Sequence, residues 1–236
     1  MKRIVYSICA ALLFMAAVQT ASAQTEETRQ VSGFNSIGSA GPFNVHVKID
    51  GTESLRIKAD KAIISEIETL VEGRELKIRF KHRDHWDRDD YGKTPIEVYI
   101  TAKSLSALAN AGSGNIDVDG ELSGENVKLS LSGSGGISTG SKSEDLHVSI
   151  SGSGSVHLRG SANMAKISIA GSGQLMAKQF KTGDASVSIA GSGNAYFAAD
   201  KNISAHIAGS GSVIYSGSAT VSNSHTIGSG RVSKED

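Results

Sequence analysis

The sequence has almost none of the residues that cross-link a chain or interrupt its regular structure. Among 236 residues there are one cysteine, Cys9, and two prolines. A disulfide within the chain is therefore excluded, and the fold has to be stabilised by burial of apolar side chains and by hydrogen bonds. A chain of this length usually forms one large domain or two small ones.

An excess of charge of either sign is also missing, because 24 lysine and arginine residues stand against 24 aspartate and glutamate residues. Nucleic acids and anionic membranes attract strongly basic proteins, so the balanced charge argues against both as partners. We therefore expect no nucleic-acid partner.

Long apolar runs are missing outside the first 23 residues. Lys2 and Arg3 precede an apolar run of about 15 residues, and Ala21-Ser22-Ala23 follows it. This order predicts a secretory signal peptide that is cleaved after Ala23. A membrane-spanning helix needs about 20 apolar residues, so we expect no transmembrane helix after cleavage. We expect export of the mature chain to the periplasm, the outer-membrane surface or the extracellular space.

A repeat organises the second half of the chain, where most of the 27 glycines lie. The tripeptide Gly-Ser-Gly occurs seven times, at intervals of 18 to 21 residues. A nearly fixed period marks a repeat array and not a linker of low complexity. The seven tripeptides begin at residues 112, 133, 152, 171, 191, 209 and 228.

The flanks of each tripeptide alternate between apolar residues and small or polar ones. Such alternation predicts short strands with one buried face. Each repeat then contains a strand, a Gly-Ser-Gly corner, a second strand and a loop of about eight residues. The expected inward pairs before the corners are Leu129/Leu131, Val148/Ile150, Ile167/Ile169, Val187/Ile189 and Ala205/Ile207, and those after them are Ile116/Val118, Ile137/Thr139, Val156/Leu158, Leu175/Ala177, Ala195/Phe197 and Val213/Tyr215.

A unit of two short strands cannot bury its apolar face alone, so it has to stack on its neighbours. The sequence therefore predicts an all-β fold, a right-handed parallel β-helix or solenoid of about seven coils of about 19 residues. The competing repeat fold, a β-propeller, needs about 40 residues per blade. The last repeat, 221–227, loses the apolar alternation, as the terminal coil of a solenoid does.

Residues 24–108 are expected to form a strand-rich N-terminal region with one helix, the entry part of the solenoid, followed by the repeat solenoid at 109–236. Residues 43–49 and 54–58 alternate as strands, and Asp50-Gly51 between them signals a hairpin. Asp60 is suited to cap a helix over 61–71 that Gly73 closes. Residues 75–80 and 96–100 are further strands. The region is either a small α+β unit or a decorated first coil of the column.

The order of these segments resembles a known family. Residues 72–78 read Glu-Gly-Arg-Glu-Leu-Lys-Ile, residues 104–108 read Ser-Leu-Ser-Ala-Leu, and residues 111–116 read Ala-Gly-Ser-Gly-Asn-Ile. With the repeated corners they are similar to the exported bacterial family described as "putative auto-transporter adhesin, head GIN domain", a domain of unknown function. The resemblance covers roughly residues 31–232. It implies a β-helix-like solenoid and supplies no catalytic residues.

The Gly-Ser-Gly tripeptide itself has two chemical interpretations. Backbone N–H groups in glycine-rich turns bind anions, but neither a Lys-Ser/Thr pair nor a helix follows the tripeptide here. Calcium-binding solenoids carry a carboxylate two positions after the second glycine, whereas this chain has only apolar residues there. We therefore predict a tight corner, with no regular calcium and no cofactor. The residues at that position are Ile116, Ile137, Val156, Leu175, Ala195, Val213 and Val232.

The most polar stretch, residues 81–91, holds the candidates for ligand contact. It reads Lys-His-Arg-Asp-His-Trp-Asp-Arg-Asp-Asp-Tyr. His82, His85 and Asp87 are residue types that bind metal ions, and the carboxylates of Asp84 and Asp87 with the ring of Trp86 suit a sugar. The alternative is a solvated loop between strands 75–80 and 96–100.

Outward serines offer a second surface. At about 4.8 Å between strands they form a hydroxyl ladder that suits a repetitive ligand such as a polysaccharide or ice, although small surface serines are also ordinary in strands. The remaining histidines show no ligand spacing. The serines are Ser130, Ser149, Ser168 and Ser188, with His206 next in the row, and the histidines are His147, His157, His206 and His225.

The sequence favours a non-enzymatic exported solenoid, an adhesin-like interaction module of the cell envelope or surface. The expected partners are a glycan or a cell-surface protein, with a second copy bound through the ends or faces of the solenoid. The alternative is a polysaccharide-binding protein or a carbohydrate-active enzyme, because parallel β-helices often host such enzymes. Against an enzyme, the outward positions of repeats two to six are mainly Ser, Ala and His, with Asp117 as an isolated exception.

Overall fold

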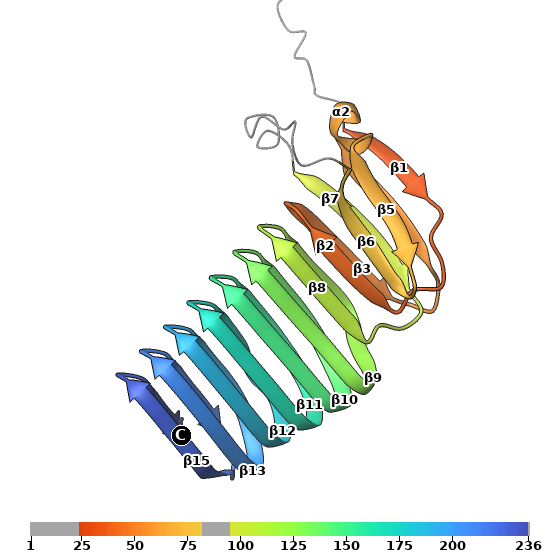
Figure 1. Cartoon of the computed structure of the whole chain (residues 1–236). Coiled ribbons are helices and arrows are strands. Elements are labelled where there is room, and N and C mark those ends of the chain that lie inside the picture. Colours follow the sequence, from red (N-terminus) through yellow and green to blue (C-terminus); the bar gives the residue numbers. More distant parts are fainter. Residues whose placement is uncertain (1–23, 82–94, 236) are drawn as a thin grey trace, which may run out of the picture.

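The computed structural model of the chain describes residues 24–81 and 95–235. The expected signal peptide, residues 1–23, lies outside this range. Nearly all described residues belong to strands, and the chain winds into a parallel β-solenoid whose seven Gly-Ser-Gly corners stack along one edge (Figure 1). The predicted β-solenoid is confirmed. Among the described residues no helix is long and apolar enough to cross a membrane.

Each long strand runs from one corner to the next, and the continuous sheet of these strands bends to form two faces. We call the face of the segments that lead into the corners, such as 128–132, the pre-corner face, and the face of the segments that leave them, such as 115–119, the post-corner face. Neighbouring long strands pair in parallel along almost their whole length. These strands are β9 (Asn115–Gly133), β10 (Gly136–Gly152), β11 (Ser155–Gly171), β12 (Gln174–Gly191) and β13 (Asn194–Gly209).

The expected eight-residue loop between the two faces is wrong, because the chain remains in the ladder as it bends from one face to the other. The bend is marked by register shifts, such as those between Ser138 and Gly140 and between His157 and Arg159. A bulge lets a strand turn while most of its backbone groups stay hydrogen-bonded.

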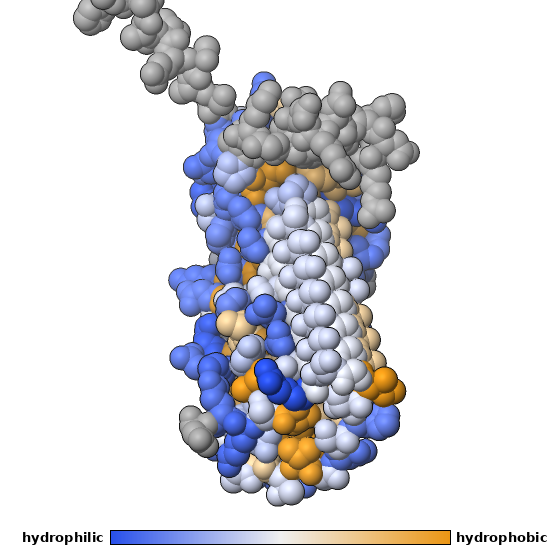
Figure 2. Space-filling view, turned by 90° about the vertical axis from the view of Figure 1, so that its left-hand side faces the viewer, coloured by the Kyte–Doolittle hydropathy of each residue, from blue (hydrophilic) through white to orange (hydrophobic). Residues whose placement is uncertain are grey.

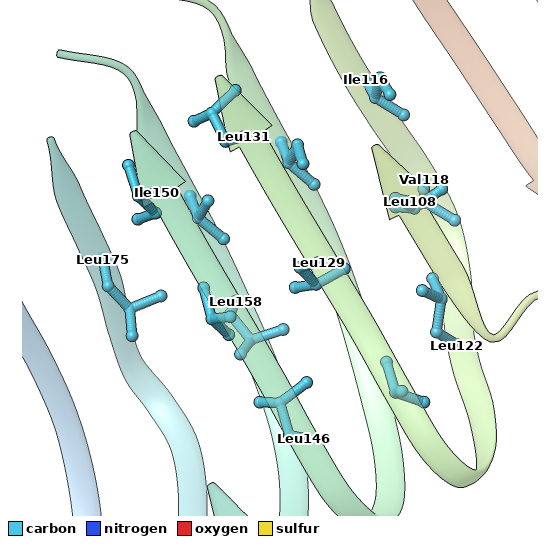
Figure 3. Close-up of a cluster of buried hydrophobic side chains, with 14 of the residues drawn as sticks. Leu108, Ile116, Val118, Leu122, Leu129, Leu131, Leu146, Ile150, Leu158 and Leu175 are labelled. Carbon is cyan, nitrogen blue, oxygen red and sulfur yellow. The ribbon is translucent and has the colours of Figure 1, made fainter. Parts of the chain in front are cut away.

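The core lies between the two faces and includes all the residues that alternation predicts. Every inward pair named above is buried, from Ile116 with no exposed surface to Tyr215 at 8% exposure. Figure 3 shows how equivalent leucines and isoleucines of successive coils, such as Leu131 and Ile150, lie side by side on neighbouring strands. Full burial of a Val, Leu, Ile or Phe side chain stabilises a fold by about 1.5–3 kcal/mol, so this column is the main stabilising element.

The Gly-Ser-Gly corners stack so closely that a side chain does not fit at the glycines. Gly171 has a φ of +111°, and a Cβ there would lie 2.6 Å from the carbonyl oxygen of Gly152 in the preceding corner. The N–H of Ser172 donates to that oxygen at 2.9 Å. A positive φ and a close backbone contact both favour glycine. The tripeptide is therefore a tight corner, as predicted, and its backbone hydrogen-bonds to the preceding corner.

The first half of the chain extends the same column. β2 (Ser36–Ala40) and β3 (Phe43–Ile49) turn at Gly41 and stack in parallel on β8 (Ala107–Gly112) and β9. β6 (Glu75–Phe80) stacks on β2, and β7 (Ile96–Ala102) stacks on β3. One cluster of buried hydrophobic residues runs from Phe34 to Ala219. These strands are decorated first coils of the solenoid.

The N-terminal end of the column is closed by antiparallel strands and a short helix. β1 (Thr25–Arg29) pairs with β4 (Ser54–Ala59), which pairs with β7, and β5 (Ile67–Glu72) pairs with β6. Antiparallel edge strands and a helix end the parallel stack, which would otherwise present an open edge.

The helix predicted over 61–71 is wrong beyond its first turn. Helix α2 spans Lys61–Ile64, after which β5 begins at Ile67. Ile67, Thr69 and Val71 are β-branched residues that fit an extended strand, and β6 offers an unpaired edge. The hairpin of β5 and β6 turns at Gly73, whose φ is +62°. Pairing with β6 therefore overrides the helical spacing of the apolar residues.

The predicted hairpin between residues 43–49 and 54–58 is also wrong. The chain does reverse at Asp50-Gly51, but β7 lies between β3 and β4, parallel to the first and antiparallel to the second. The N–H groups of Asp50 and Gly51 donate to the carbonyl oxygen of Ala102 at the end of β7, which holds the widened turn.

The C-terminal coil is atypical, as the sequence predicts. It consists of β14 (Ser212–Ser216), β15 (Thr220–Gly228) and β16 (Arg231–Lys234). Ser224 and Thr226 of β15 are in register with the buried Ala205 and Ile207 of β13. Polar residues at inward positions suit the last coil, because no further coil covers them.

Candidate binding groove on the post-corner face

One outward row of the post-corner face joins strands that are far apart in the sequence. Adjacent members are in register on neighbouring strands, so their side chains are separated by about the 4.8 Å strand spacing. From the N-terminal end, the row changes from charged and aromatic residues to apolar ones. It consists of Arg56, Tyr99, His46, Asp117, Ser138, His157, Met176, Tyr196 and Ile214.

The first half of this row lies in an open groove of about 640 Å³. A second hollow of about 380 Å³ continues along the face and shares Ser138 and Arg159 with the first. Together they form a groove that follows the column across several coils. The residues of the first hollow are His46, Val47, Lys48, Ser54, Arg56, Tyr99, Ile100, Thr101, Asp117, Val118, Asp119, Ser138 and Arg159.

A stack of three side chains forms one end of the groove. The guanidinium carbon of Arg56 lies 4.7 Å from the ring centre of Tyr99. The imidazole of His46 stacks on the same tyrosine, with ring centres 5.1 Å apart and planes inclined by 22°. The carboxylate of Glu26, on the outer strand β1, lies 2.9 Å from the guanidinium of Arg56. Cation–π and ring stacking therefore fix three polar side chains on three adjacent strands.

Glu97 holds His46 in this stack. Its carboxylate accepts a hydrogen bond from Asn44 Nδ2 at 2.9 Å and lies 2.6 Å from His46 Nε2. Burial raises the pKa of Glu97, but the hydrogen bonds from Asn44 and His46 outweigh it, and the pKa is lower than its usual value. An ionised Glu97 stabilises the Nε2–H form of the ring, and this contact fixes the orientation of the His46 imidazole.

Charged groups of both signs line the middle of the groove. Asp117 and Asp119 of β9 are in register with His46 and Lys48 of β3. Arg159 reaches across from β11 and donates to the carbonyl oxygen of Gly120 at 3.3 Å. Carboxylates accept hydrogen bonds, and Lys and Arg donate them, so this surface is suited to a ligand that carries many hydroxyl groups. The described residues contain no group of three or more His, Cys, Asp or Glu side chains that could hold a metal ion.

The far end of the row is apolar. Met176 is 40% exposed, and it lies between His157 and Tyr196 in register. Lys178 lies over the ring of Tyr196, 5.7 Å from its centre, and contacts Glu235 at 2.6 Å. This end therefore adds apolar contact area to the groove.

The pre-corner face carries the serine ladder that the sequence predicts. Ser130, Ser149, Ser168 and Ser188 are in register on four successive strands, and His206 follows. Figure 2 looks onto the corners, where a pale stripe runs along the column and most blue side chains lie to its left.

The sequence-predicted contact residues His82, Asp84, His85, Trp86 and Asp87 lie outside the described residues, so their role stays a hypothesis. The expectation that outward positions are mainly Ser, Ala and His holds on the pre-corner face. It is wrong on the post-corner face, where Met176, Tyr196 and Ile214 face outward. The signal was available in the sequence, because the residue between each inward pair after a corner has to face outward.

Comparison with known proteins identifies the family of the chain and several solved structures with a similar fold. Over residues 33–219 it matches the family model described as "Putative auto-transporter adhesin, head GIN domain". None of the curated proteins compared with it matches.

Three solved structures share the fold. The crystal structure of a putative adhesin from Bacteroides fragilis NCTC 9343 has a TM-score of 0.82 at 23% identity and covers 93% of this chain and 100% of its own. A putative adhesin from Parabacteroides merdae ATCC 43184 has a TM-score of 0.70 at 23% identity, covering 92% and 98%. A putative lipid binding protein from Parabacteroides distasonis ATCC 8503 has a TM-score of 0.68 at 21% identity, also covering 92% and 98%. With the family model matching most of its length, the chain belongs to the auto-transporter adhesin, head GIN domain family.

Proposed function

We propose that this protein is a non-enzymatic interaction module of the bacterial cell envelope or surface, and that it binds an extended glycan along the post-corner groove. The observation that carries the proposal is the row of outward side chains on the post-corner face, whose members from Arg56 to Met176 line two hollows that share Ser138 and Arg159. The description of the family as an adhesin and the solenoid fold support a surface role. The N-terminal sequence pattern supports export.

A glycan fits the groove better than a protein partner does, for two physical reasons. The polar groups of Tyr99, His46 and Asp117 recur at the strand spacing of about 4.8 Å, and a polysaccharide also presents hydroxyls at regular intervals. The groove carries both carboxylates and cations, which suits a hydroxyl-rich ligand without strong charge of one sign. Met176 and Tyr196 then provide apolar surface for the sugar C–H groups.

The experiment is a glycan array probed with the mature protein, followed by titration of the strongest binder. Tyr99→Ala removes the ring between Arg56 and His46, and Asp117→Asn removes a carboxylate charge. Each substitution is expected to weaken binding by at least tenfold. Met164→Ala is the matched control, because Met164 is 55% exposed and lies outside the groove.

Two outcomes would contradict the proposal. One is the absence of binding to every glycan on the array. The other is binding that Tyr99→Ala and Asp117→Asn leave as strong as in the unmodified protein.

A further inference from the structure

Two exposed histidines of the pre-corner face lie side by side at the C-terminal end of the column. His206 of β13 is in register with His225 of β15. Their ring centres are 6.2 Å apart, and the planes are inclined by 57°. The two histidines are 19 positions apart in the sequence, which is one full coil of the solenoid. Their proximity is therefore evident only once the stacking of the coils is known.

We propose that His206 and His225 form a two-histidine site for a late first-row divalent metal ion such as Cu²⁺ or Zn²⁺. Imidazole nitrogen is a preferred ligand of both ions. The ion would be bound by one nitrogen from each ring, with water in the remaining positions. This site is independent of the groove and of the function proposed for it.

The spacing of the two rings suits such an ion. A bound zinc lies about 2.0–2.1 Å from each imidazole nitrogen and therefore roughly 3.2 Å from each ring centre, which places two ligating rings about 5–6.4 Å apart for angles between tetrahedral and linear. The observed 6.2 Å falls in that interval. Both side chains are exposed, so small rotations about χ1 and χ2 can aim the nitrogens at a common point.

The other histidines of the repeats do not have this arrangement. His147 on the same face is in register with Lys128 on one side and Lys166 on the other. His157 on the post-corner face lies between Ser138 and Met176. A protonated lysine cannot ligate a cation and repels it. His147 is therefore a matched control, an exposed histidine on the same face with cationic neighbours.

Metal binding at this site would stabilise β15, the most exposed strand of the solenoid. All residues of β15 after Val221 are exposed, and Ile227 is 65% exposed. The strand is held to β13 mainly by the backbone ladder. A ligand that binds only the folded state stabilises it, so an ion bridging β13 and β15 would slow the opening of the terminal coil.

The test uses the mature chain without an affinity tag, freed of metal. Titration calorimetry measures the affinity for Zn²⁺ and Cu²⁺. Backbone amide NMR locates the ion, because paramagnetic Cu²⁺ broadens only nearby signals. Hydrogen exchange of the β15 amides is measured with and without Zn²⁺. The variants are His206→Ala, His225→Ala and the control His147→Ala.

The expected result is binding that either His206→Ala or His225→Ala weakens by at least tenfold, while His147→Ala does not change it. Cu²⁺ should broaden signals around residues 206 and 225, and Zn²⁺ should slow exchange in β15 of the unmodified chain but not in the two site variants. The proposal is overturned if Cu²⁺ broadens signals only elsewhere, or if neither site variant binds more weakly than His147→Ala.

Discussion

The pre-corner and post-corner faces are built from the same coils, yet their outward surfaces differ. Both faces bury an alternating pair of apolar residues in each coil. Outside, β10 carries Ser149 in the serine ladder of the pre-corner face and Ser138 in a groove between Asp117 and His157. Stacking dictates the inward residues on both faces, whereas it leaves the outward residues free. The two faces therefore differ only at their outward positions, and the proposed glycan site rests on that difference.

The largest effect is expected at a corner, because both faces depend on it. Gly171→Ala forces a Cβ against the carbonyl of Gly152 at a φ of +111°. We expect a loss of about 3–5 kcal/mol in the free energy of unfolding, from backbone strain and overpacking together. Urea unfolding measures it. Ser172→Ala in the same corner is the control, with an expected change within about 0.5 kcal/mol. Equal stability of the two variants would show that the corners are not closely stacked.

A smaller effect on stability is expected from Glu97 on the post-corner face, and it depends on pH. Because the pKa of Glu97 is held below its usual 4.5, its ionised form stabilises the fold above about pH 4.5, and this contribution is lost as the pH falls through the lowered pKa. Glu97→Gln should therefore destabilise the protein by about 1–2 kcal/mol at pH 7 and by less at pH 3. Urea unfolding of both proteins at the two pH values measures the difference. A gap that stays constant from pH 7 to pH 3 would show that the charge of Glu97 has no part in holding His46.

The smallest effect is expected on the pre-corner face. Ser168→Ala removes one hydroxyl from an exposed ladder and should change the free energy of unfolding by no more than about 0.5 kcal/mol. Thermal and urea unfolding measure it. A loss above about 1 kcal/mol would mean that the serine hydroxyls bond to one another along the column and that the ladder is a structural element of its own.

The sequence predicts what depends on local alternation and on the fixed repeat. The inward residues, the corners and the atypical last coil all follow from positions within one coil, and the structure confirms them. The short helix α2 and the strand β5 could not be predicted from spacing, because an unpaired edge of β6 decides between helix and strand at Ile67. The place of β7 between β3 and β4 likewise depends on pairing between distant segments.

The groove is hidden from the sequence for the same reason. Residues 46, 56, 99 and 117 become neighbours only when β4, β7, β3 and β9 pair in that order. His206 and His225 are a simpler case, because a spacing of one coil places them together once the register is known. In a solenoid, candidate sites have to be sought down columns of the stack as well as along the chain.

The most direct test of the account compares two serines of the same strand, Ser138 and Ser149, on opposite faces of β10. Ser138→Trp fills the middle of the groove, whereas Ser149→Trp adds the same side chain to the serine ladder. Titration of each variant with the glycan that binds best is the measurement. The account predicts that Ser138→Trp weakens binding by at least tenfold and that Ser149→Trp leaves it within about twofold. Loss of binding in Ser149→Trp with binding retained in Ser138→Trp would contradict it and assign the interaction to the serine ladder.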